Sequence, residues 1–122
     1  IHAGLAIIDT MNFVKAPVYT IETGLAASMG AAILSAGEKG HRMALPNASI
    51  MLHQASSGDQ GNIQDLRVSL AYTEKLNSRL MEMIAKNCGK SKKELEKDTI
   101  RDNWMFPEDA KLYGIVDEVV GK

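Results

Sequence analysis

A serine, a histidine and an aspartate, the residue types that together cleave peptide bonds, occur in this order along the chain. Ser28 follows an apolar segment and is flanked by small residues, so we expect it at a turn from a strand into a helix. A helix N-terminus leaves N–H groups without intrahelical partners. The Met29 N–H would therefore stabilise the oxyanion formed when Ser28 attacks a carbonyl. The plainer alternative is a serine N-cap on a tightly packed helix.

His53 ends an apolar segment and precedes a glycine-bearing loop. Functional side chains often emerge where a strand meets a loop. A general base for Ser28 needs an imidazole that is neutral near pH 7. His41 and His2 compete for this role, but we expect His41 to be solvated in a polar turn. Taken alone, His53 is more often a structural histidine.

Two carboxylates, Asp98 and Asp102, lie between two expected short helices. One of them would orient His53 and stabilise its charged form. Taken alone, such a run is usually a solvated turn with helix caps. Residue types therefore leave the choice between a catalytic and a structural role open.

The spacing of apolar and turn residues predicts the elements that position these side chains. Strand, helix, strand, strand and helix in this order indicate an α/β layered fold. Helices are expected over 2–13, 24–37 (starting near Ser28), 63–87, 91 onward (a capping box of Ser91 and Glu94) and 107–113 (closed by Gly114). Strands are expected over 18–21 (buried), 42–45, 49–53, and 115–116 with 119–120. A loop containing Gly58 and Gly61 is expected over 55–62.

The expected helix over 63–87 is long for a chain of 122 residues. At 1.5 Å per residue it would span roughly 37 Å, so it should project from the domain. Its apolar residues recur three and four apart and form one seam, which favours an amphipathic helix. The seam consists of Ile63, Leu66, Leu70, Thr73, Leu76 or Asn77, Leu80 and Ile84.

Length and composition narrow the function. The chain has the size of one domain. A net charge of −1 with 24% charged residues argues against a basic surface for nucleic acid or an anionic membrane. No apolar run approaches the roughly 20 residues of a membrane span. A single cysteine, Cys88, forms no intrachain disulfide and suits a reducing compartment. No metal or cofactor motif is evident, and a P-loop is absent from the sequence.

Four motifs, in their order along the chain, resemble those of the proteolytic subunit of Clp protease (ClpP). They are residues 26–30 (AASMG), 45–47 (LPN) before 50–54 (IMLHQ), 98–102 (DTIRD) and 113–117 (YGIVD). Ser28 and His53 are 25 residues apart, and His53 and Asp102 are 49 apart, as in the catalytic triad of this family. The similarity runs from about Ala3 to Val120.

The resemblance implies that Ser28 is the nucleophile, His53 the general base and acid, Asp102 the orienting carboxylate and Met29 an oxyanion-hole donor, with Asp98 outside the triad. It implies a crotonase-like α/β fold with a projecting handle helix and no cofactor. Two stacked heptameric rings, a tetradecamer, would enclose a chamber. An AAA+ unfoldase of the Clp type would feed unfolded polypeptides into it, and the subunit would be cytoplasmic.

The chain also departs from the family pattern. It begins at Ile1 inside an apolar-periodic segment, so we expect residues 1–122 to be the C-terminal two-thirds of a single peptidase domain. The resemblance implies that the first strands and a glycine-rich segment with the second oxyanion donor precede Ile1, so residues 1–122 alone should be a poor peptidase.

Single residues also depart from the family pattern. Ala55 stands where members usually have Pro. Ile100 replaces the acid that often precedes Arg101, so the ion pair that couples the rings in the family would lack its acidic partner.

Two other functions stay open. A crotonase-type acyl-CoA enzyme shares the fold and stabilises a thioester oxyanion with two backbone donors, but it needs no serine–histidine–aspartate triad. A non-catalytic assembly subunit, or a fragment with an incomplete site, is the third possibility.

Overall fold

The computed structural model describes residues 1–56 and 60–121 of a mixed α/β fold, which confirms the expected fold class. Part of the expected loop over 55–62, including Gly58, lies outside the described residues. The elements are α1 (His2–Phe13), β1 (Thr20–Glu22), β2 (Leu25–Ala27), α2 (Met29–Ser35), β3 (Arg42–Ala44), β4 (Ser49–Leu52), α3 (Ile63–Cys88), α4 (Lys92–Asp98), β5 (Asn103–Met105), α5 (Pro107–Tyr113) and β6 (Glu118–Val119).

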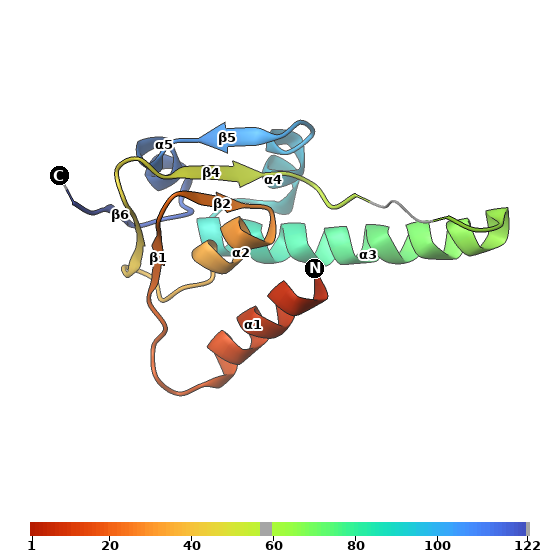
Figure 1. Ribbon diagram of the computed structural model, residues 1–122, viewed down its shortest axis with the longest axis horizontal. Helices are drawn as coiled ribbons and strands as arrows, with labels where there is room; N and C mark the ends of the chain where they lie inside the picture. Colours follow the sequence, from red (N-terminus) through yellow and green to blue (C-terminus); the bar gives the residue numbers. More distant parts are fainter. Residues whose placement is uncertain (57–59, 122) are drawn as a thin grey trace.

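The strands form two three-stranded sheets. One has the order β1-β3-β6 and is parallel throughout. The other has the order β2-β4-β5, in which β2 and β4 are parallel and β4 and β5 antiparallel. In Figure 1, β2, β4 and β5 lie above α2, and α1 lies below it. Helix α2 therefore sits between the second sheet and α1.

Several expected strands differ from the structure. The strand expected over 18–21 begins two residues later, at Thr20, and is not buried, because Ile21 is 56% exposed on the edge strand of its sheet. The sequence pattern does not predict strands β2 and β5. Each has three residues, too few to show an alternating pattern. The expected strand over 115–116 is buried chain without strand pairing, and only Glu118–Val119 pairs with β3.

The core is aliphatic, as the low aromatic content suggests. Its buried side chains come from α1, α2, both sheets and the C-terminal half of α3. Met51 and Met81 are buried in it, where flexible thioethers fill irregular gaps. Cys88 is also buried, and burial raises the pKa of its thiol to about 11. Cys88 therefore packs as a small apolar residue with an unreactive thiol.

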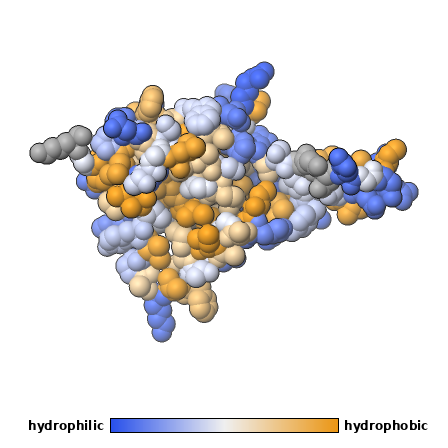
Figure 2. Space-filling view, viewed as in Figure 1, coloured by the Kyte–Doolittle hydropathy of each residue, from blue (hydrophilic) through white to orange (hydrophobic). Residues whose placement is uncertain are grey.

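Helix α3 projects from the body of the molecule, as expected (Figure 1). Its C-terminal part is in the core, where Leu80 is 5% and Ile84 2% exposed. Its N-terminal part is in solvent, where Ile63 is 69% exposed. Figure 2 shows apolar side chains among polar ones along this projecting part. The exposed apolar residues there are Ile63, Leu66, Val68, Leu70 and Tyr72.

The ends of the helices follow the local sequence signals. The Asn62 side chain accepts the Asp65 N–H at the start of α3, and Gly89 ends that helix with a φ of 70°. Ser91 and Glu94 form the expected capping box at the start of α4. Gly114 ends α5 with a φ of 102°, and a side chain there would collide with the Cys88 carbonyl.

An ion pair between a buried arginine and a half-buried aspartate joins two helices of the core to the first sheet. Arg42 on β3 is 2% exposed and pairs with Asp117 at 2.7 Å. Its guanidinium also donates to the backbone carbonyls of Ser35 on α2 and Asn87 on α3. The hydrogen bond from the Arg42 side chain lowers the pKa of Asp117 to about 2, against the effect of partial burial. This network fixes the C-terminal ends of α2 and α3 relative to β3.

Candidate active site

Ser28 occupies a sharp turn between β2 and α2. Its φ is 56° and its ψ −118°, and no other non-glycine residue of the described chain has a positive φ. An ordinary N-cap has extended dihedrals and a side chain that accepts a backbone N–H. Ser28 has neither feature: its dihedrals are not extended, and its side chain makes no capping hydrogen bond. The geometry instead resembles the strained strand–turn–helix that exposes a nucleophilic serine.

Small residues make this turn possible. A Cβ placed on Gly30 would lie 3.8 Å from the Ala26 Cβ, so the turn brings these two positions into contact. Gly4 on α1 lies against Met29, and a Cβ on Gly4 would be 3.1 Å from the Met29 Cβ. The close approach of α1 therefore holds the residue after Ser28 in place.

The backbone N–H groups at the start of α2 have no partner within the helix. The first intrahelical bond runs from the Ala32 N–H to the Ser28 carbonyl at 3.2 Å, so the N–H groups of Met29, Gly30 and Ala31 precede it. Such groups carry partial positive charge. Ser28 thus lies next to donors that suit a developing oxyanion.

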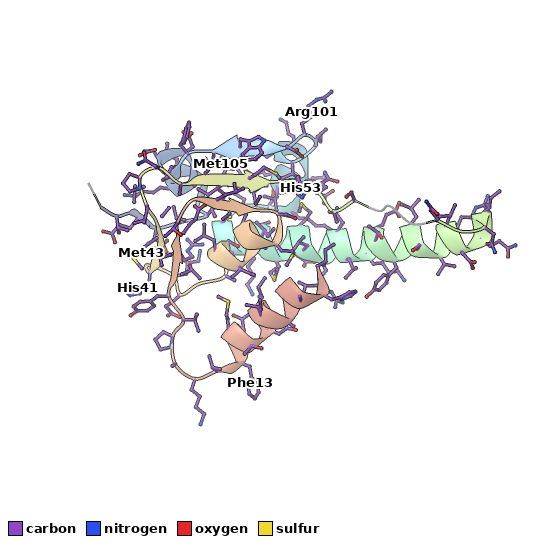
Figure 3. The ribbon with its side chains drawn as sticks, viewed as in Figure 1. Phe13, His41, Met43, His53, Arg101 and Met105 are labelled. Carbon is purple, nitrogen blue, oxygen red and sulfur yellow. The ribbon has the colours of Figure 1, made fainter. Side chains whose placement is uncertain are left out.

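The pairing of β2 with β4 brings His53 to the same end of the sheet as Ser28. Ala27 pairs with Met51 in the parallel register, and the Ser28 N–H donates to the Met51 carbonyl at 3.1 Å. Strand β4 ends at Leu52, so His53 is the next residue. Figure 3 shows His53 at this end of β4. Both side chains therefore follow the carboxyl ends of adjacent parallel strands, where sites in α/β sheets commonly form.

The pairing of β4 with β5 brings Asp102 opposite His53. Leu52 pairs with Asn103 in the antiparallel register, so the next positions outward are His53 and Asp102. The His53 Nδ1 lies 3.5 Å from the Asp102 Oδ1. The two side chains are 30% and 59% exposed. The unexpected strand β5 is thus what places this carboxylate beside the imidazole.

Asp98 has a different environment. The Tyr113 hydroxyl donates to the Asp98 Oδ2 at 2.7 Å, and the Asn103 side chain donates to the Asp98 carbonyl. Burial, followed by this hydrogen bond to a carboxylate, raises the pKa of Tyr113. Asp98 therefore joins α4 to α5, and of the two candidate carboxylates Asp102 is the one that lies beside His53.

The other candidate histidines, and the two residues before Asp102, have different surroundings. His41 is exposed and stacks on Tyr19, with ring centroids 4.0 Å apart, and Figure 3 shows it near Met43 and away from His53. His2 stacks on Tyr72 of α3. Ile100 is 75% exposed and Arg101 is exposed too, on the loop between α4 and β5 (Figure 3).

A buried carboxylate that sequence reasoning missed lies close to the turn. Glu22 on β1 is 5% exposed, and neither carboxylate oxygen has a hydrogen-bond partner of good geometry in the described chain. Burial raises its pKa to about 7, and the nearby Ala26 N–H offsets part of this rise. Glu22 lines a cavity of about 450 Å³ together with Ala26 and Gly30, the residues two positions before and after Ser28. An acidic residue in a short apolar strand is the only signal for it in the sequence.

Residues 1–56 and 60–121 contain no group of His, Cys, Asp and Glu side chains arranged to hold a metal ion. No helix in these residues is long and apolar enough to cross a membrane.

Comparison with known protein families gives a match that extends from the first residue of the chain to the last. The family model described as Clp protease matches residues 1–122. The match includes the turn at Ser28, the end of β4 and the loop before β5. It agrees with the mixed α/β fold and with the projecting helix α3. The chain therefore belongs to the Clp protease family, as a protein of the ClpP type.

Proposed function

We propose that this chain is the catalytic subunit of a serine endopeptidase, with Ser28 as nucleophile, His53 as general base and acid, and Asp102 as orienting carboxylate. The observation that carries the proposal is their position at one end of the adjacent strands β2, β4 and β5. The positive φ of Ser28 adds to it, because this strain has no role in a simple N-cap.

The reaction follows from the orientation of the imidazole. With Nδ1 toward Asp102, Nε2 is the atom that takes the Ser28 proton as the Oγ attacks the peptide carbonyl. The Met29 N–H stabilises the oxyanion. His53 then gives its proton to the leaving amine as the C–N bond breaks and the acyl-enzyme forms. A water molecule, deprotonated by His53, attacks the acyl carbonyl, and His53 returns that proton to the Ser28 Oγ as the ester C–O bond breaks.

The proposal extends to the substrate and the assembly. We infer that the chain forms stacked heptameric rings and cleaves unfolded polypeptides delivered by an AAA+ unfoldase of the Clp type. The exposed apolar residues on the projecting half of α3 support a contact between subunits. A cytoplasmic location agrees with a single, buried cysteine.

The proposal is tested by hydrolysis of a fluorogenic peptide by the assembled protein. Ser28→Ala should abolish hydrolysis without changing the mass of the assembly. Ser49→Ala is the matched control, because Ser49 lies at the far end of β4 from His53, and this variant should retain activity. Equal hydrolysis by wild type and Ser28→Ala would reject the proposal. Binding of acyl-CoA without peptide hydrolysis would indicate the crotonase-type alternative.

A further inference from the structure

The chain directly after His53 is attached to two helices. The Ala55 N–H donates to the Asn77 Oδ1 on α3 at 2.7 Å. The Gln54 side chain donates to the Glu96 carbonyl on α4 at 3.2 Å. Figure 1 shows the chain leaving β4 toward the space over α3. The two residues that follow His53 are therefore each fixed by one hydrogen bond.

His53 depends on these attachments because its other restraints are weak. Strand β4 ends at Leu52, so sheet pairing does not extend through His53. The 3.5 Å between its Nδ1 and Asp102 exceeds the 2.7–2.9 Å typical of a charge-assisted N–H···O bond. Both side chains are partly in solvent. The backbone on the C-terminal side of His53 is thus a main determinant of where the imidazole lies.

Asn77 is well placed to hold that backbone. It lies where α3 passes from solvent into the core, three residues before buried Leu80. The turns of α3 that follow Asn77 are packed in the core, so the helix holds the Asn77 amide firmly. Asn77 and Ala55 are both half-buried, and their hydrogen bond is shorter than that of the neighbouring Gln54.

We infer that Asn77 is a positioning residue for His53: its side-chain oxygen holds the Ala55 N–H and thereby sets the imidazole between Ser28 and Asp102. The inference rests on the proposed function, since it assigns Asn77 a role in the same reaction. Asn77 itself touches neither substrate nor reacting atoms. Displacing a catalytic group by about 1 Å can cost roughly 100-fold in rate.

The test compares Asn77→Ala, Asn77→Asp and Ser78→Ala in the assembled protein. A fluorophosphonate probe reports the maximal acylation rate and the probe concentration at half-maximal rate. We expect Asn77→Ala to lower the maximal rate by about 10- to 100-fold, with little change in that concentration. Asn77→Asp should restore most of the rate, because a carboxylate oxygen still accepts the Ala55 N–H. Ser78→Ala is the matched control, since Ser78 contacts Lys92 instead and should acylate like wild type.

Hydrogen exchange at the Ala55 amide is measured on the same variants. Exchange should be faster in Asn77→Ala and near wild type in Asn77→Asp. Wild-type acylation in Asn77→Ala with fast exchange at Ala55 would overturn the inference while leaving the proposed function intact. Equal loss of rate in Asn77→Ala and Asn77→Asp, with α3 destabilised in both, would also overturn it in favour of a merely structural role. Acylation of wild type at a residue other than Ser28 would reject the proposed function, and the inference with it.

Discussion

The His53 Nδ1 and the Asp102 Oδ1 lie 3.5 Å apart across the antiparallel pair of β4 and β5. Asp102→Asn should therefore keep the fold but lower turnover by up to about 10⁴-fold, because the amide favours the wrong tautomer of the imidazole. Peptide hydrolysis at saturating substrate measures the loss. Asp98→Asn is the control, since it still offers an acceptor to Tyr113 and should hydrolyse nearly as well as wild type. If the two variants lost activity equally, Asp102 would have no special role.

The buried carboxylate of Glu22 should make stability depend on pH. Its pKa is raised from 4.5 to about 7, so the folded state holds the proton more tightly than the unfolded state. Its contribution to stability is full below pH 4.5 and is lost as pH rises through about 7. Ionised Glu22 then costs up to about 3 kcal/mol at pH 8. Glu22→Gln should be more stable than wild type at pH 8 by up to that amount, and should lose this advantage at pH 4.

Urea denaturation at both pH values measures the difference. Glu38→Gln serves as the control, because Glu38 is exposed and should show no such dependence. The same free-energy difference between Glu22→Gln and wild type at pH 4 and pH 8 would show that Glu22 does not titrate in this range.

The ion pair of Arg42 and Asp117 should dominate acid stability. The pKa of Asp117 is lowered from 3.8 to about 2, so its contribution is present above pH 3.8 and is lost as pH falls toward 2. Asp117→Asn leaves the buried Arg42 charge without its partner and should cost about 3–5 kcal/mol at pH 7. It should also flatten the decline in stability between pH 4 and pH 2. Circular dichroism during acid titration tests this, with exposed Asp109→Asn expected to follow wild type.

The projecting half of α3 should carry contacts between subunits. Leu70 is 52% exposed, so Leu70→Asp leaves the core intact and should lower the assembly mass and peptide hydrolysis together. Lys75→Asp, off the apolar seam, is the matched control. Leu80 is unsuitable for this test because it is packed within its own subunit at 5% exposed. An unchanged light-scattering mass for Leu70→Asp would argue against assembly through this helix.

Local signals are sufficient to predict most helices and the turn at Ser28. Short stretches of sequence are enough to recognise the capping box at Ser91, the glycine after α5 and the long apolar seam of α3. The position of His53 at the end of β4 follows from its place after an apolar run. These features depend on neighbours within a few residues, which periodicity and turn chemistry describe well.

Features that depend on distant partners are not predictable from the residues alone. Strand β5 exists because it pairs with β4, and that pairing decides which carboxylate lies beside His53. The burial of Glu22 follows from the packing of β1 against α2. The hydrogen bond of Asn77 to Ala55 joins residues 22 positions apart, and the seam pattern leaves Asn77 undistinguished from Leu76.

The site of covalent labelling is the most direct measurement of whether Ser28 is the nucleophile. The assembled protein is treated with a fluorophosphonate, digested and analysed by tandem mass spectrometry. We predict one adduct, on the Ser28 Oγ, formed slowly when Asp102 is replaced by Asn. An adduct on any other residue, or none under conditions in which the protein hydrolyses peptides, would contradict the assignment of Ser28, His53 and Asp102 as the catalytic residues.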